Sequence, residues 1–130
     1  MTDHTPAQAA RLSGFSLDTL RYYERIGLLG AVRRDDAGRR VYSDQDLDWL
    51  GMVRCLRDTG MPIQQMRRYA GLALGRTGDS VAERVELLEE HAERVDETIA
   101  LLRRQQEHLA GKIAYYRSVL AEPPSTAARA

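Results

Sequence analysis

Apolar residues in the second half of the chain recur in alternating steps of four and three residues, from Val81 to Leu120. Such a seven-residue repeat is typical of a helix that packs against another chain in a coiled coil. We therefore expect a coiled-coil dimerisation helix over 77–121 and a homodimer, and the repeat leaves open whether the helices run parallel or antiparallel. The seam positions expected to join the two copies are Val85, Leu88, Val95, Ile99, Leu102, Leu109 and Ile113.

Shorter helical patterns, separated by glycines, fill the first 76 residues. Each pattern begins at a capping residue or a proline and carries apolar residues at three- and four-residue spacing. The helices predicted from these signals cover 6–13, 17–26, 44–59 and 62–73.

The first two of these helices have the spacing of a helix-turn-helix. Ala10 lets the helices cross closely, Gly14 makes the turn and Leu20 packs back on the first helix. We expect Leu17, Leu20 and Tyr23 to form the inner face of the second helix. Its polar positions suit a helix that enters the major groove of DNA, although a solvated helix face has the same composition. Those positions are Asp18, Thr19, Arg21, Tyr22 and Arg25.

Two short segments, 31–34 and 39–42, flank a turn rich in Asp and Gly and predict a two-stranded hairpin. The hairpin carries Arg33, Arg34, Arg39 and Arg40. A basic ribbon after a helix-turn-helix is typical of a wing that contacts the DNA backbone or the minor groove. The alternative is an ordinary solvated hairpin.

Charge separates the two halves of the chain. The total is zero, from 19 Lys and Arg against 19 Asp and Glu, but residues 1–76 carry 12 Arg and 9 acids (+3), whereas residues 77–122 carry 6 cations and 10 acids (−4). The single cysteine excludes a disulfide within the chain, and no run of 18 apolar residues or secretion signal is visible. We expect a cytoplasmic protein that does not contact a membrane and holds no metal or cofactor. A tail over 122–130 is expected to be disordered.

The stretch from Thr19 to Leu29 closely resembles the recognition-helix signature of the MerR family of bacterial transcription regulators. The segments Gly38–Tyr42 and Leu56–Met61 are similar to the next blocks of that family, except that Arg39 stands where the family usually has an aromatic residue. The resemblance implies a mainly α fold, with a winged helix-turn-helix DNA-binding domain over 1–76 followed by an antiparallel coiled-coil helix.

The resemblance also implies a function. Dimers of this family bind a palindromic DNA operator between promoter elements that are spaced too far apart for RNA polymerase, and they activate transcription by bending and untwisting the spacer. The positions that match the family's DNA contacts are Thr19, Arg21, Tyr22, Arg40 and Tyr42, with Ser16 and Asp18 as further candidates.

Cys55 is the candidate residue through which the regulator would sense its inducer. No cysteine lies in the coiled-coil region, which argues against a thiolate metal sensor, and nine residues after Ala121 are too few for a ligand-binding domain. Val53–Arg57 resembles a small subgroup that senses reactive aldehydes or nitrosative stress through one cysteine in this helix. Arg54 and Arg57 would favour the thiolate and Asp58 would oppose it. The alternative is a buried Cys55 that acts as a small hydrophobe.

Other classes of protein remain as alternatives to a thiol-responsive regulator. The same regulator with a different inducer is one, and an architectural DNA-bending protein without a sensor is another. A pure coiled-coil interaction protein would not need the basic hairpin. An enzyme is not expected, because the chain has no nucleophile–base pair, Gly-rich phosphate loop or metalloprotease motif.

Overall fold

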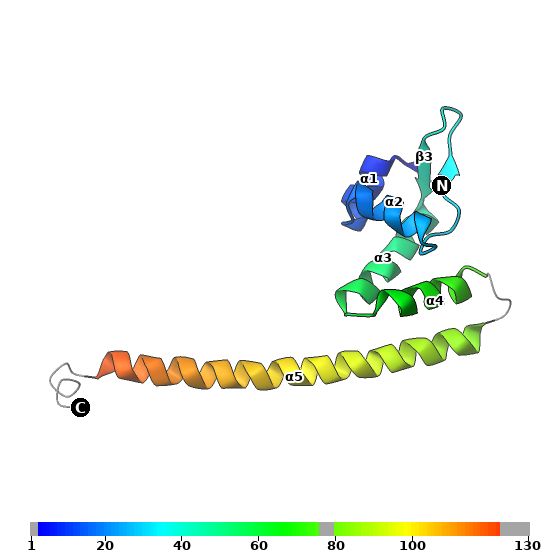
Figure 1. Cartoon of the computed structure of the whole chain (residues 1–130). Coiled ribbons are helices and arrows are strands. Elements are labelled where there is room, and N and C mark those ends of the chain that lie inside the picture. Colours follow the sequence, from blue (N-terminus) through cyan, green and yellow to red (C-terminus); the bar gives the residue numbers. More distant parts are fainter. Residues whose placement is uncertain (1–2, 76–79, 123–130) are drawn as a thin grey trace. The chain divides into compact units, whose positions relative to one another are not determined.

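The computed structural model describes residues 3–75 and 80–122 and consists mainly of helices (Figure 1). It confirms the expected order of a helix-turn-helix, a hairpin, two further helices and a long C-terminal helix. The helices are α1 (Pro6–Ser13), α2 (Leu17–Arg25), α3 (Asp44–Asp58), α4 (Ile63–Ala73) and α5 (Val81–Ala121), and the strands are β1 (Asp3–His4), β2 (Arg33–Arg34) and β3 (Arg40–Ser43).

Local capping defines the helix-turn-helix. Thr5 caps α1, because its hydroxyl accepts from the Gln8 backbone N–H (3.2 Å) while the Gln8 side chain accepts from the Thr5 N–H (2.9 Å). Gly14 ends α1 with φ +79°, a left-handed conformation that favours glycine. A Cβ at Gly14 would overlap the guanidinium of Arg54, which donates to the Ser13 carbonyl oxygen at 3.0 Å. The turn is therefore fixed by its own backbone and by a side chain from α3.

The predicted hairpin forms between β2 and β3, with Arg33 opposite Val41. β2 is shorter than the predicted segment 31–34, and β3 is shifted by one residue from the predicted segment 39–42. β3 also pairs with β1, a strand that was not predicted from the sequence. In that pairing Asp3 lies opposite Ser43. β3 is thus the central strand of a small antiparallel sheet.

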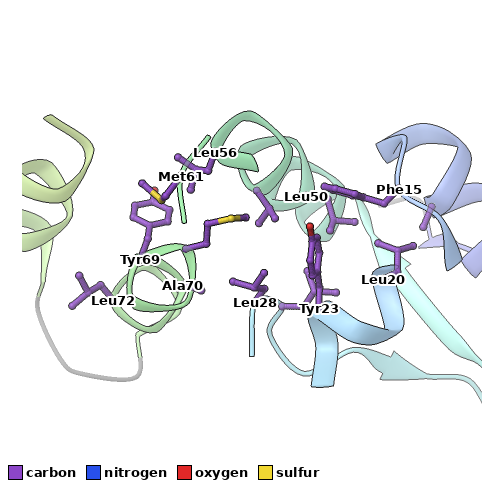
Figure 2. Packing of buried hydrophobic residues seen from close by; sticks show 14 of the residues in the cluster. Phe15, Leu20, Tyr23, Leu28, Leu50, Leu56, Met61, Tyr69, Ala70 and Leu72 are labelled. Atoms are coloured by element: carbon purple, nitrogen blue, oxygen red, sulfur yellow. The ribbon is translucent and has the colours of Figure 1, made fainter. Parts of the chain in front are cut away.

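One hydrophobic cluster joins α2, α3 and α4 (Figure 2). Leu20 and Tyr23 are buried as expected, and Tyr23 meets Phe15 edge-on with ring centroids 5.3 Å apart. The expectation for Leu17 is wrong, because 38% of its surface is exposed. Leu17 is the first residue of α2, and its side chain borders a hollow beside the wing instead of entering the core.

The first compact unit spans Met1–His91 and includes the first turns of α5. Leu87 and His91 are buried there, and Leu88 packs partly against the same cluster. His91 Nε2 lies 2.7 Å from the hydroxyl of Thr59 at the end of α3. The expected domain boundary between residues 76 and 77 lies outside the described residues. The first unit, which we call the head, includes the start of α5 as far as His91.

The second compact unit begins at Ala92 and, in its described part, consists of the rest of α5. Its seam residues Ile99, Leu102, Leu109 and Ile113 each expose 41–60% of their surface. Except for Glu122, the expected disordered tail lies outside the described residues. None of the helices in the described ranges is long and apolar enough to cross a membrane.

Candidate nucleic-acid interface

The N-terminus of α2 presents short hydroxyl side chains whose roles differ. The Ser16 hydroxyl caps the helix by accepting from the Thr19 N–H at 3.1 Å, and it donates its proton to the Thr19 hydroxyl oxygen at 2.9 Å. The Thr19 proton is therefore left for an outside acceptor. Ser16 positions Thr19, and Thr19 is the better donor to a DNA phosphate or base.

The exposed side of α2 carries the charged and aromatic candidates. Arg21 lies 3.6 Å from Asp18 in a loose, solvent-exposed ion pair, which costs little to open. Tyr22 is 43% exposed, and the guanidinium of Arg25 lies 5.5 Å from its ring centroid. The adjacent tyrosines thus separate, with Tyr23 in the core and Tyr22 facing solvent beside two arginines.

The four wing arginines are already engaged within the chain. At the base of the wing, Arg33 binds Asp3 at 2.7 Å, and Arg40 Nε binds Glu24 Oε1 of α2 at 2.7 Å. Nearer the turn, Arg34 donates to the Gly38 carbonyl oxygen at 2.9 Å and Arg39 to Asp35 at 3.2 Å. The pairs with Asp3 and Glu24 were not predicted from the sequence, because these partners lie far from the wing along the chain.

Asp35 closes the wing turn. Its carboxylate accepts from the backbone N–H groups of Ala37 (3.0 Å) and Arg39 (2.9 Å). The Arg39 backbone N–H is the main cause that holds the pKa of Asp35 below its ordinary value. Desolvation opposes it, and the Arg39 charge and the Ala37 N–H lower the pKa further. The turn is therefore stabilised by an ionised Asp35, a role that was not predicted from the sequence.

The position of Tyr42 differs from the expectation that this residue contacts DNA. Only 1% of its surface is exposed, and it is among the largest fully buried side chains. Burial, followed by the charge of Glu24, raises the pKa of its phenol above the ordinary value. β3 alternates its side chains across the sheet, and Tyr42 falls on the side facing the core, so it supports the wing instead of contacting DNA.

Cys55 is exposed on α3, so the alternative of a cysteine buried within the chain is wrong. The neighbouring side chains Arg54 and Arg57 both pair with Asp58. Asp58 accepts from Arg57 at 3.0 Å and from Arg54 at 3.3 Å. The hydrogen bond from Arg57, ahead of that from Arg54, lowers the pKa of Asp58. The two arginines near the thiol therefore share one carboxylate, and the three charged groups together carry a net charge of +1.

The described ranges hold no cluster of three or more His, Cys, Asp or Glu side chains that could bind a metal ion. The seam of α5 lies in the second unit, apart from Val85 (48% exposed) and Leu88 in the first. Val95 is half-buried. The side chains that the sequence proposes for DNA and for dimerisation thus belong largely to different units.

Family models of one class of regulatory protein match both the head and the long helix. A family model described as MerR HTH family regulatory protein matches residues 5–71, and one described as MerR, DNA binding, matches residues 47–112. A relative from Haemophilus influenzae, described as an uncharacterized HTH-type transcriptional regulator, is 38% identical to this chain over 118 residues. The match spans 91% of this chain and 87% of the relative.

Two solved structures are similar over most of the chain. One is HiNmlR, a MerR family regulator lacking the sensor domain, bound to promoter DNA; it is 38% identical, with a TM-score of 0.84 over 92% of this chain and 94% of that chain. The other is a transcriptional regulator of the MerR family from Bacillus thuringiensis, 26% identical, with a TM-score of 0.78 over 88% of this chain and 100% of that chain. These relatives are transcription regulators and not enzymes.

Proposed function

The chain belongs to the MerR family of helix-turn-helix regulatory proteins, and we propose that it binds a palindromic promoter site as a homodimer and activates transcription by deforming the DNA. DNA binding and transcription regulation are the parts of this function that the comparisons support. The observation that carries it is the likeness of nearly the whole chain, head and long helix together, to a relative bound to promoter DNA. The protein would act in the cytoplasm, where the promoter and RNA polymerase are found.

The proposed DNA contacts come from α2 and the wing. Thr19 donates from the start of α2, and Arg21 and Tyr22 follow on its exposed side. Asp18 keeps Arg21 near the helix and can accept from a cytosine amino group. Arg40 lies at the wing base with 27% of its side chain exposed, so its free guanidinium nitrogens can bind a phosphate while Nε remains on Glu24.

The proposed homodimer rests on the exposed seam of α5. Each seam leucine or isoleucine would contribute about 1.5–3 kcal/mol when it is fully buried against a second helix. Ile99, Leu102, Leu109 and Ile113 supply such side chains over about two turns on each side of Gln106, the polar seam position. Two heads joined in this way would contact two half-sites, which is why we propose a palindrome. The family resemblance favours the antiparallel arrangement.

Activation by DNA deformation follows from binding two half-sites at once. If each head binds its half-site best on bent and untwisted DNA, the backbone contacts of both heads offset the deformation energy. RNA polymerase would then meet promoter elements at a suitable spacing. Removal of one head contact should therefore reduce activation and binding together.

We propose Cys55 as the sensor, because it is an exposed thiol on a helix of the head. Its thiol can add to an aldehyde: the sulfur–carbon bond forms as the carbonyl π bond breaks, and the thiol proton passes to the carbonyl oxygen. Because HiNmlR is described as lacking the sensor domain, the alternative is a regulator with a non-thiol inducer or an architectural protein with no inducer.

The experiment combines DNA binding with transcription. Duplexes that bind are first selected from a random pool, and their affinity is measured by fluorescence anisotropy. Arg21→Ala should weaken binding across sequences and reduce the salt slope by about one, whereas Arg104→Ala on α5 should do neither. Unchanged affinity of Arg21→Ala would remove this residue from the interface.

The sensor is tested on a promoter that contains the selected site. Cys55→Ala should retain DNA binding but lose the transcriptional response to formaldehyde or methylglyoxal. Full induction of this variant would assign the response to another site, and a wild-type protein that responds to no treatment would favour the architectural alternative.

A further inference from the structure

A hollow of about 540 Å³ lies between α3 and α4 of the head, and its lining combines apolar side chains with two carboxylates. We call it the acidic hollow. The apolar side chains are Trp49 and Met52 of α3, Tyr69 of α4 and Leu74, the residue that caps the end of α4. The carboxylates are those of Asp46 and Asp48, in the first two turns of α3. A hollow of this size with apolar walls and a few polar groups is typical of sites for small organic molecules.

The aromatic wall of the acidic hollow is held in place by the fold. The rings of Trp49 and Tyr69 stack nearly parallel, with centroids 5.7 Å apart and an interplanar angle of 8°. Trp49 Nε1 also donates to the Leu28 carbonyl oxygen at 2.7 Å, which fixes the orientation of the indole. Because the wall exists before a ligand arrives, binding requires little ordering of side chains.

The charge of the acidic hollow is opposite to that of the surrounding head. Asp46 accepts from the Ser43 N–H at 2.9 Å through one oxygen and thereby caps α3, which leaves its second oxygen. Asp48 is exposed and makes no ion pair or hydrogen bond with any described residue. Among the residues that the structure describes, no Lys or Arg lines this space. Two carboxylates without a cation repel a DNA phosphate and attract a cationic ligand.

The hydroxyl of Tyr69 also lacks a partner. Only 9% of Tyr69 is exposed, yet its hydroxyl makes no hydrogen bond within the described part of the chain. A buried phenol normally has such a partner. The oxygen is not among the unpaired atoms that are sealed from solvent, so it belongs to the accessible part of Tyr69. Since Tyr69 borders the acidic hollow, a ligand there can supply the missing hydrogen bond.

We propose that the acidic hollow binds a small organic cation, consisting of an ammonium group on an apolar body. The ammonium group pairs with Asp48 and Asp46 and donates to the Tyr69 oxygen. The apolar body packs on Trp49 and on the aliphatic side of the hollow. This binding site goes beyond the proposed DNA-binding function, and Cys55 does not line it.

The test uses the purified chain without DNA and three probes that share one apolar body: phenylbutylamine, phenylbutanol and phenylbutyrate. Trp49 is the single tryptophan of the chain and reports binding by its fluorescence. Phenylbutylamine should change this fluorescence saturably, with a Kd on the order of 1 mM for a ligand of this size. The neutral alcohol should bind at least about threefold more weakly and the anion more weakly still. Equal affinities of the three probes would overturn a cation site.

Substitutions separate the local carboxylate from overall charge. Asp48→Asn should weaken phenylbutylamine binding about three- to tenfold and leave phenylbutanol binding unchanged. Asp36→Asn is the matched control, because Asp36 is an exposed aspartate of the same head that does not line the hollow. Tyr69→Phe keeps the stacked ring and should weaken amine binding about two- to tenfold. Unchanged amine binding in Asp48→Asn, or an equal loss in Asp36→Asn, would overturn the proposal.

Two further measurements do not depend on the fluorescence of Trp49. Saturating phenylbutylamine should raise the midpoint of urea unfolding of the wild type and raise it less in Asp48→Asn. Equal shifts would contradict binding at Asp48. If a second copy of the chain fills the hollow instead, phenylbutylamine should not bind and Asp48→Asn should shift the monomer–dimer equilibrium in sedimentation, which would also overturn the proposal. Loss of the proposed DNA binding would leave every one of these results unchanged, so the two failures can be told apart.

Discussion

Arg40 in β3 donates from Nε to Oε1 of Glu24 in α2 at 2.7 Å, so a half-buried ion pair joins the wing to the recognition helix. The side chains of Arg40 and Glu24 are 27% and 24% exposed, and Tyr42, two residues after Arg40 in β3, is buried in the core. The two elements of the head that we propose to contact DNA are therefore held together by this ion pair.

Replacement of Glu24 by Ala should lower the free energy of unfolding by about 1–2 kcal/mol, because it leaves Arg40 half-buried without its partner. Urea unfolding at one fixed protein concentration measures this change. Asp18→Ala is the control, since its pair with Arg21 is long and exposed and should change stability by less than about 0.5 kcal/mol. Equal effects of the two variants would show that the Glu24 pair does not stabilise the head.

Gly14→Ala should destabilise the chain more than Gly38→Ala does. Both glycines are left-handed, with φ of +79° and +81°, and an alanine in this conformation costs about 1–2 kcal/mol. Only at Gly14 does the added Cβ meet a neighbour, the Arg54 guanidinium, which would lose its bond to Ser13. The difference between the two variants in urea unfolding should be about 1 kcal/mol. A Gly38 variant as unstable as the Gly14 variant would contradict the role of Arg54.

Tyr42→Phe should leave DNA affinity at neutral pH unchanged, because the ring is buried and does not face DNA. Tyr22→Ala, which removes an exposed ring, should weaken binding in the same assay. A loss of affinity in Tyr42→Phe similar to that in Tyr22→Ala would restore Tyr42 as a DNA contact.

Tyr42→Phe should also change how the free energy of unfolding depends on pH in the alkaline range. The pKa of Tyr42 is raised in the folded state, so the stability contributed by the neutral phenol is fully present below its ordinary pKa of about 10 and is lost as pH rises through the folded value. Tyr42→Phe should therefore lose less unfolding free energy than wild type between about pH 9 and 11. Parallel pH profiles of the two proteins would contradict burial of the phenol.

Leu102→Lys should give monomers in sedimentation equilibrium, because it places a charge at the centre of the seam. Leu101→Lys is the matched control. Leu101 is also exposed, but it lies one residue off the seam and points about 100° away around the helix. Near-UV circular dichroism should show a folded head in both variants. A dimer in Leu102→Lys, or monomers in both, would contradict the assigned seam.

The sequence predicted the features that arise from local spacing. The caps at Thr5 and Ser16, the turn at Gly14 and the seven-residue repeat of α5 are each written within a few neighbouring residues, and the structure contains the helices that they predict. The side of α2 that carries Arg21 and Tyr22 also follows from helical periodicity and is exposed.

Features that depend on distant partners were missed. β1 consists of two residues with no pattern of its own and exists because β3 offers it an edge. The ion pair of Arg40 joins residues sixteen positions apart, so the sequence did not show that this wing arginine is already paired with a carboxylate. Leu87 and His91 show why periodicity was insufficient for α5: it identifies an apolar stripe but not whether that stripe packs on the head or on another chain.

The composition and symmetry of the protein–DNA complex test the central claim most directly. Duplexes selected from a random pool by the purified chain can be sequenced, and the mass of the complex with one such duplex measured by sedimentation. Two chains per duplex and an inverted repeat in the selected sequences are the expected result. One chain bound at full affinity to a site without a repeat would contradict a regulator that reads DNA as a pair.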